Sequence, residues 1–350
     1  MSEAVVALDP APRARLGPLV VGALLLSMTA AALVTYKASA ALATIAKVEK
    51  TGTLGPKAEW IPTAALPAAA RPFAGTANYF SWVLIALTFG VLLGAIVKSL
   101  IPDAWLARTL AGRGVQGQLV AAIAGAPLML CSCCVAPVFE GVYERTRRLG
   151  PALGLMLASP ALNPAAIALT FMLFPASIAY SRLVLAIALV LLASSLLGRA
   201  FPDTRAAECP VDWQRPAYGG MLRGFFVALG QVMWRSVPAI ALGVLASAAI
   251  TGLVPVQSLA GSSGAMIATV AVALLAVPLA MPTFGEIPIG LALLSAGAPQ
   301  GAVLALLLAG PSVNLPSLLT LARVVSVRVA IATAATVFVL ASAGGLILGR

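Results

Sequence analysis

Long apolar runs, several of them about twenty residues in length, dominate this sequence. They stand at about 79–101, 164–178, 181–198, 235–254, 314–327 and 329–348. A helix needs about 20 apolar residues to cross the hydrocarbon core of a bilayer. Charged residues make up only 9% of the 350 positions, against about a quarter in an average soluble domain. The chain is therefore predicted to be an all-α polytopic membrane protein.

The basic residues are spread along the chain and form no single patch. The net charge is +11, but the lysines and arginines fall in loops and at helix ends, as in the cytoplasmic loops of membrane proteins. We expect a lipid bilayer and a small solute as partners, and no nucleic acid. The sequence has no histidine and no Gly-rich phosphate loop. We therefore expect no ATP binding of that kind, no cofactor, no resident metal and no enzyme activity.

The chain divides into an N-terminal part and two halves. Its first apolar run, residues 16–36, is longer than the core of about 7–15 residues in a signal peptide, which favours an uncleaved span over a cleaved signal. Polar, Pro- and Ala-rich residues follow at 37–78, where we expect a periplasmic loop. The predicted units are an N-terminal tail, span and loop (1–78), a first transmembrane repeat (79–199), a cytoplasmic linker (200–220) and a second transmembrane repeat (221–350).

The two halves are related in sequence. A shift of 151 residues places 127–163 on 278–314 without a gap, and 10 of the 37 positions are identical. Half of these are Leu or Ala, which are common here; the other five are Pro127, Pro137, Gly150, Pro160 and Asn163. Self-similarity of this kind indicates a duplicated structural unit. We name residues 127–137 the first tip and residues 278–288 the second tip.

The charge pattern predicts that the second half is inverted in the membrane. Residues 144–148 contain Glu-Arg-Thr-Arg-Arg, whereas their counterparts at 295–299 carry no charge. Because basic loops stay in the cytoplasm, these loops should lie on opposite faces. A re-entrant hairpin in each half leaves three crossings per half, and an odd number inverts the second half. The fold prediction is thus two inverted repeats, each with a broken helix and a re-entrant hairpin. The alternative is that every apolar segment spans, which gives nine or ten helices.

Each half also contains a break within an apolar run. Pro-Ala-Leu-Asn-Pro at 160–164 matches Pro-Ser-Val-Asn-Leu-Pro at 311–316, and proline kinks or ends a helix. Backbone groups freed in lipid are tolerated only inside protein or beside a water-filled cavity. We predict that Asn163 and Asn314 line the solute path; the alternative is that they only cap broken helix ends.

The first tip carries three cysteines within four positions, Cys131, Cys133 and Cys134, with Ser132 between them. Thiols are soft ligands that suit thiophilic metals and metalloids. Free cysteine is also a small apolar residue in many protein cores, but three so close together exceed what packing usually requires. We predict that these four residues bind the solute. Cys209, in the linker, is interpreted as incidental.

The second tip carries Glu286, the only acidic residue after Asp212. An ionisable side chain inside a membrane segment is costly and is by default a functional candidate. We predict that Glu286 couples transport to protons, that Thr283 contacts the solute, and that Glu140 is a second proton-coupling candidate. The alternative for Glu286 is a neutral carboxyl bonded to Thr283 or to a backbone carbonyl. Arg235 is expected at an interface or paired with a carboxylate.

These residues resemble the predicted permease family whose best-described members export trivalent organoarsenicals. The likeness rests on Cys-Ser-Cys followed by Pro137, on Ser-Pro-Ala-Leu-Asn-Pro at 159–164 and on Gly-Pro-Ser-Val-Asn-Leu-Pro at 310–316. It covers about residues 79–350, and it implies that Cys131 and Cys133 are the family's paired cysteines. The family often has glycine where this chain has Cys134, and often a small Cys- or Ser-containing turn at the second tip.

Two functions from different classes fit the sequence. The first is a secondary transporter in the bacterial inner membrane that exports a small solute, such as a trivalent (organo)arsenical or another thiophilic species. The second is a membrane-embedded thiol-redox protein, or a partner protein without transport activity of its own. The lack of polar groups near the cysteines counts against redox chemistry. The sequence leaves the oligomeric state open, a homo-oligomer included.

Overall fold

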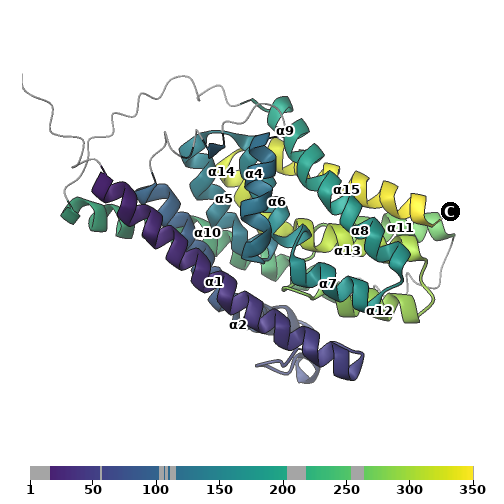
Figure 1. Ribbon diagram of the computed structural model, residues 1–350. Coiled ribbons are helices and arrows are strands. Elements are labelled where there is room, and N and C mark those ends of the chain that lie inside the picture. The colour runs from purple at the N-terminus through teal and green to yellow at the C-terminus, as the bar shows by residue number, and fades with distance from the viewer. Residues whose placement is uncertain are drawn as a thin grey trace, which may run out of the picture.

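Helices make up the regular structure of the described residues, and no strand occurs among them (Figure 1). The computed structural model describes residues 16–55, 57–101, 106, 109–110, 116–202, 218–253 and 264–349. The tail before residue 16 and most of the linker, with Cys209, lie outside this part of the chain. Within it, the predicted all-α architecture is confirmed.

One long helix, α1 (Leu16–Thr51), precedes two sets of helices that follow the same order. The first set is α2 (Arg71–Leu100), α4 (Gln116–Gly125), α5 (Ser132–Thr146), α6 (Leu149–Ala161), α7 (Pro164–Leu173), α8 (Ala176–Ala188) and α9 (Ser194–Ala200). The second set is α10 (Tyr218–Leu253), α11 (Ala265–Ala276), α12 (Glu286–Ser295), α13 (Gln300–Ser312), α14 (Leu315–Val324) and α15 (Val327–Leu348). Short helical turns stand at Thr63–Ala65 and Ala126–Leu128, and a π-helical turn, Leu189–Ala193, joins α8 to α9.

Six helical stretches are long and apolar enough to cross a membrane, or seven if α13 and α14, bent by 44° at their break, count as one. The six are Val20–Thr51, Arg71–Leu100, Leu149–Leu173, Ala176–Ala200, Leu222–Ala249 and Val327–Leu348. Seven spans correspond to one from α1 and three from each set. The described residues therefore form a multi-pass membrane fold, with fewer spans than the nine or ten expected if every apolar segment crossed.

The first helix is longer than the sequence analysis predicts. Residues 37–51, expected in a loop, continue α1 through Thr51. They are rich in alanine and lysine, which favour helix, and contain neither glycine nor proline. The helix ends before Gly52, whose φ of 67° is the left-handed conformation that often follows a helix. Helices α2 and α10 likewise begin before the predicted starts at 79 and 235, since helix propensity extends beyond the apolar stretch.

The two sets correspond in detail in their middle parts. Adding 151 to the bounds of α6 and α7 gives the bounds of α13 and α14. A close approach is repeated as well: a Cβ on Gly150 would meet Gln118 and the backbone oxygen of Ser194. The same approach occurs 151 positions further along, where a Cβ on Gly301 would meet Thr269 and the backbone oxygen of Gly345. The shift seen in the sequence thus also relates helix boundaries and packing contacts.

In each set, the two helices that flank a tip pack against the helix that follows. Helices α4 and α5 both contact α6, and α11 and α12 both contact α13. The Leu130 amide of the first tip donates to Ser159 Oγ in α6 at 3.1 Å. At the equivalent place in α13, a Cβ on Gly310 would come within 3.0 Å of Met281 Sδ in the second tip. Each tip therefore packs against the equivalent position of the helix that follows it, which is Ser159 in α6 and Gly310 in α13.

Candidate solute site

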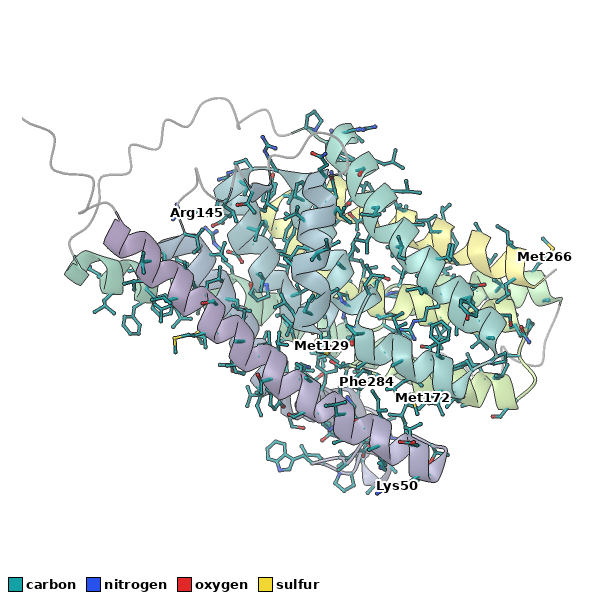
Figure 2. All side chains as sticks on the ribbon, in the orientation of Figure 1. Lys50, Met129, Arg145, Met172, Met266 and Phe284 are labelled. Carbon is teal, nitrogen blue, oxygen red and sulfur yellow. The ribbon has the colours of Figure 1, made fainter. Side chains whose placement is uncertain are left out.

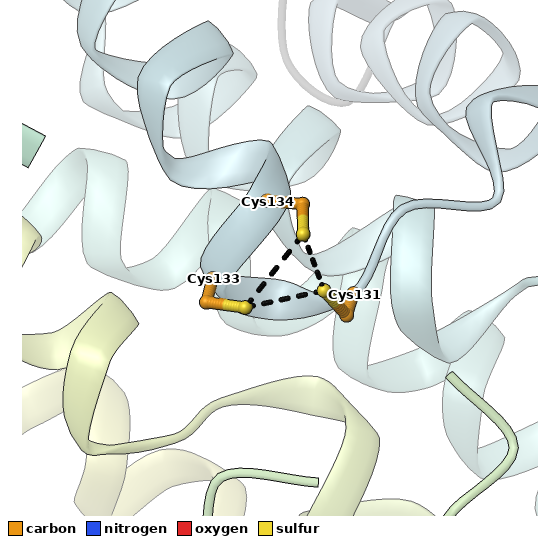
Figure 3. A group of neighbouring side chains, drawn as sticks. All are labelled: Cys131, Cys133 and Cys134. Carbon is orange, nitrogen blue, oxygen red and sulfur yellow. Dashed lines mark hydrogen bonds between the residues drawn. The ribbon is translucent and has the colours of Figure 1, made fainter. Parts of the chain in front are cut away.

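Three thiols converge at the first tip (Figure 3). The Sγ atom of Cys131 lies 3.2 Å from that of Cys133 and 2.7 Å from that of Cys134, and the last two are 3.8 Å apart. All three are buried and free of disulfides. The Tyr79 hydroxyl of α2 lies 3.0 Å from Cys133 Sγ. These predicted residues thus form one group of soft ligands, together with a tyrosine that no local sequence pattern marks.

The start of α5 explains this convergence. Cys131 has an extended backbone, with φ −71° and ψ 162°, and the helix begins at Ser132. The carbonyl oxygen of Cys131 accepts from the amides of Cys134 and Val135, each at 3.0 Å. Its thiol is therefore turned toward the first helical turn, where the other two thiols lie. The positive end of the α5 dipole stands beside the three sulfurs and stabilises negative charge there.

Glu286, the first residue of α12, forms a buried ion pair. Its Oε1 accepts from Arg182 Nη2 of α8 at 2.9 Å, and the two side chains are only 3% and 1% exposed. Arg182 Nη1 also donates to Thr170 Oγ1 at 2.6 Å. The carboxyl therefore meets a cation rather than Thr283 or a backbone carbonyl. Sequence reasoning missed Arg182, although an arginine within the apolar stretch 176–188 is a detectable signal.

A small cavity joins the two tips and both breaks. Its volume is about 20 Å³, which holds about one water molecule. Four predicted site residues line it: Cys131, Asn163, Thr283 and Glu286. Four others are buried but do not line it: Ser132, Cys133, Cys134 and Asn314. The fold therefore brings the conspicuous residues of both tips together, with the first break beside them.

Both asparagines cap the helices that follow their breaks. Asn163 Oδ1 accepts from the amides of Ala165 and Ala166 at 3.0 and 3.3 Å. Asn314 Oδ1 accepts from the amide of Ser317 at 3.0 Å, and Ser317 Oγ accepts from the Asn314 amide at the same distance. Within the described residues, Asn314 Nδ2 has no hydrogen-bond partner. Capping thus accounts for one atom of each side chain, while Asn163 also faces the cavity.

Two lysines contact the second tip from the N-terminal part of the chain. Lys37 Nζ of α1 lies 3.5 Å from Thr283 Oγ1, and Lys57 Nζ donates to Thr283 O at 3.0 Å. The Lys57 ammonium also lies 5.6 Å from the centre of the Trp82 ring. Although Lys57 is an exposed residue, partial desolvation of its ammonium lowers its pKa. Sequence reasoning placed neither lysine at the site.

The two tips also meet through apolar side chains. Met129 and Phe284 pack in one cluster with Ala41 of α1 and Ala165 of α7 (Figure 2). Both have left-handed backbones, with φ of 49° and 67°, which residues other than glycine seldom adopt. Such conformations persist where the surrounding structure holds them. The packing of the tips against each other and against α1 supplies that support.

Comparison with known proteins identifies the family. A family described as predicted permeases matches residues 73–350. The chain belongs to this family. UPF0718 protein YraQ of Escherichia coli strain K12 is 33% identical over 276 residues, which cover 77% of this chain and 78% of the relative. UPF0718 protein MJ0584 of Methanocaldococcus jannaschii is 24% identical over 295 residues, covering 66% of this chain and 81% of the relative. No solved structure matches. The resemblance inferred from the tips and breaks is confirmed.

In this member of the permease family, Glu140 lies in a second charged cluster, about 9–11 Å along α5 from Cys133 and Cys134 at 1.5 Å per residue. Lys98 Nζ is 2.7 Å from Glu144 and 3.8 Å from Glu140. Arg235 Nη1 is 2.6 Å from Glu144 and 3.6 Å from Glu140, and Ser236 donates to Glu140 Oε2 at 3.1 Å. Of the two alternatives left open for Arg235, the structure shows the pairing with carboxylates, and Glu140 does not line the small cavity.

A larger cavity of about 550 Å³, here named the vestibule, adjoins the site. Its walls come from α2, α10 and the loop after α1. Tyr79, which contacts Cys133, lines it, and Pro282 lines both cavities. The Asn78 side chain anchors the loop, because it accepts from the Ile61 amide and donates to the Ile61 carbonyl, both at 2.8 Å. The vestibule thus reaches the residues that surround the thiols.

Proposed function

We propose that the protein is a secondary transporter of the bacterial inner membrane that exports a small thiophilic solute. Trivalent arsenicals, inorganic or organic, are the first class to test. The observation that carries this proposal is the group of three thiols beside a cavity shared by both tips. Soft sulfur ligands suit soft metals and metalloids, and a trivalent arsenic atom can bind several sulfurs on one side. Permease-family membership and helical spans support a transporter over an enzyme.

Two inverted repeats would let this site face either side of the membrane. Support comes from the equivalent loops, of which one is basic and the other uncharged, from the common shift of 151 residues in helix bounds, and from three spans per set. In this proposal α4–α5 and α11–α12 are re-entrant hairpins whose tips meet near the middle of the bilayer, a recurring plan in secondary transporters. The vestibule, walled by the loop after α1, is then the periplasmic opening.

Glu286 is the proposed proton-coupling group. A proton on this carboxyl removes its charge and ends the ion pair with Arg182, which joins α8 of the first set to α12 of the second. Protonation therefore changes the attraction between the two sets, as alternating access requires. Glu140 is a second proposed coupling group, because its carboxylate is buried and its Oε1 accepts no hydrogen bond within the described residues.

The proposed solute contacts extend beyond the thiols. Asn163 and Thr283 line the small cavity and can present an amide and a hydroxyl to the solute. Ser132 is buried within the cysteine group. Asn314 Nδ2, without a partner in the described residues, has a hydrogen to donate. These four residues supply polar contacts beside the soft ligands.

One observation favours a second candidate, a thiol-redox protein. Cys131 and Cys134 have the Cys-x-x-Cys spacing at a helix start, and their sulfurs lie 2.7 Å apart. This spacing is common in disulfide oxidoreductases. A redox pair needs these two thiols and not Cys133, whereas a three-sulfur site for a metalloid uses all three.

The experiment compares cysteine variants in an arsenical-sensitive bacterium. The proteins are the wild type, Cys131→Ser/Cys133→Ser/Cys134→Ser, Cys133→Ser, and Cys209→Ser in the linker as a matched control. Survival and cellular arsenic are measured across inorganic and methylated trivalent arsenicals at equal protein levels. We expect resistance from the wild type and the control, and its loss in the triple variant and in Cys133→Ser.

Two outcomes would contradict the proposal. If the wild type confers no resistance and does not lower cellular arsenic, the proposal of a metalloid solute is contradicted. Membership of the permease family is unaffected by that result. Wild-type behaviour of Cys133→Ser, with loss of resistance only in the triple variant, would instead favour the redox pair. Trapping of free thiols with an alkylating reagent would then show whether Cys131 and Cys134 cycle through a disulfide.

A further inference from the structure

Two lysines reach the candidate site from a part of the chain that the family match does not cover. Lys37 lies in α1 and Lys57 in the loop after it, whereas the match begins at residue 73. Their ammonium groups converge on Thr283, at 3.5 Å from its hydroxyl and 3.0 Å from its carbonyl oxygen. A segment outside the matched region thus adds two positive charges beside the tips.

Within the described residues, acidic groups attract Lys57 only at a distance, Glu286 among them. Neither lysine forms an ion pair there, in contrast to Arg182, whose charge is balanced by Glu286. Glu59, the acidic residue of the same loop, accepts hydrogen bonds from Thr63. The region around the second tip therefore carries a surplus of positive charge.

Lys57 stands between the two cavities. Its ammonium lies over Trp82, which lines the vestibule, and bonds to Thr283, which lines the small cavity. The ammonium thus contacts one wall residue of each cavity.

We propose that Lys37 and Lys57 form an anion-binding pair, and that the transported solute carries a carboxylate or oxyanion beside the atom that the cysteines bind. This inference rests on the proposed function and narrows its solute class to negatively charged thiophilic molecules. A neutral thiophile gains no attraction from these two charges. An anionic thiophile gains the attraction of two cations as well, and a cationic one is repelled.

The test compares two arsenicals that differ by one carboxylate, phenylarsenous acid and 4-carboxyphenylarsenous acid. Isothermal titration calorimetry measures the affinity of the purified full chain for each. The variants are Lys37→Gln/Lys57→Gln, Lys37→Arg/Lys57→Arg and Lys50→Gln. Lys50 is a matched control, because it is an exposed lysine of α1 near the end of the helix, away from Met129 and Phe284 of the tips (Figure 2).

We expect the wild type to bind the carboxylated compound on the order of tenfold more tightly than the neutral one. The glutamine double variant should lose this preference and keep its affinity for the neutral compound. The arginine double variant and Lys50→Gln should retain the preference. Equal wild-type affinities for the two compounds, or an equal loss for both in the glutamine variant, would overturn the anion-binding pair.

The cysteine triple variant separates this inference from the proposed function. Lysine-dependent binding of the carboxylated compound without the cysteines would support the anion-binding pair and contradict the thiophilic site. Cysteine-dependent binding of both compounds with equal affinity, whether or not the lysines are present, would support the thiophilic site and overturn the anion-binding pair.

Discussion

The first tip and the second tip stand at equivalent positions of the two sets, yet they carry different chemistry. The first holds three thiols, and a serine hydroxyl of α6 anchors it. The second contains no cysteine; it begins α12 with a glutamate whose partner is an arginine from the other set. What the tips share is their bounding prolines and their packing against the next helix.

This difference separates the residues that build the scaffold from those that select the chemistry. Prolines, glycines and asparagines recur at the shift of 151 residues because they shape the backbone. The shift aligns Ser132 with Thr283 and Val135 with Glu286, so the side chains between the prolines have diverged. Changes to one tip should therefore have effects that equivalent changes to the other do not.

The largest expected effect comes from breaking the ion pair that only the second tip has. Arg182→Ala leaves Glu286 buried without its cation, which typically costs about 3–5 kcal/mol of stability. The variant should unfold at a much lower temperature than the wild type when purified in detergent. The double variant Arg182→Met/Glu286→Leu should recover most of this loss, because no charge remains buried. Near-wild-type stability of Arg182→Ala would show that the two tips do not differ in this way.

A smaller effect is expected at the repeated glycines. In Gly301→Ala the new methyl meets the backbone oxygen of Gly345 and Thr269 Oγ1, so α13 and α15 must move apart, at a cost of about 1–3 kcal/mol. In Gly150→Ala the nearest atom is the end of the Gln118 side chain, which can turn away. Gly301→Ala should unfold at a lower temperature than Gly150→Ala. A lower unfolding temperature for Gly150→Ala would contradict this expected difference between the two sets.

The anchors of the tips should differ less. Ser159→Ala removes the acceptor of the Leu130 amide, and leaving a buried donor unpaired costs on the order of 1 kcal/mol. The equivalent change, Gly310→Ala, crowds only the flexible Met281 side chain, and we expect a smaller loss. Unfolding of both variants in the same detergent tests this. A larger loss in Gly310→Ala would mean that the second tip is the more rigid one.

Much of the fold was predictable because lipid leaves a chain few alternatives. Apolar runs in a bilayer must be helical, and proline with asparagine marks the ends of α6 and α13 correctly. The end of α1 was predicted too early, since hydropathy falls at Lys37 while helix propensity continues through Thr51. The inversion of the second half stays a prediction.

The site was less accessible to sequence reasoning because its contacts join distant positions. Arg182 and Glu286 are separated by 104 residues, and Lys57 and Thr283 by 226, so no local spacing relates them. The convergence of the thiols depends on the extended backbone of Cys131 before α5, which the order Cys-Ser-Cys-Cys does not determine. Residue types indicated the candidates, and only the fold shows their partners.

The smallest effect is expected where neither tip is involved. Arg235 also pairs with glutamates, but its side chain is 55% exposed, and exposed pairs contribute about 0–1 kcal/mol. Arg235→Gln should lower stability by no more than that, because Glu140 keeps Lys98 and Ser236 as partners. Thermal unfolding at low salt and at about 1 M salt, where the Debye length is about 3 Å, should show this small loss shrinking. A loss as large as that of Arg182→Ala would make the α5–α10 cluster as important to the fold as the second tip.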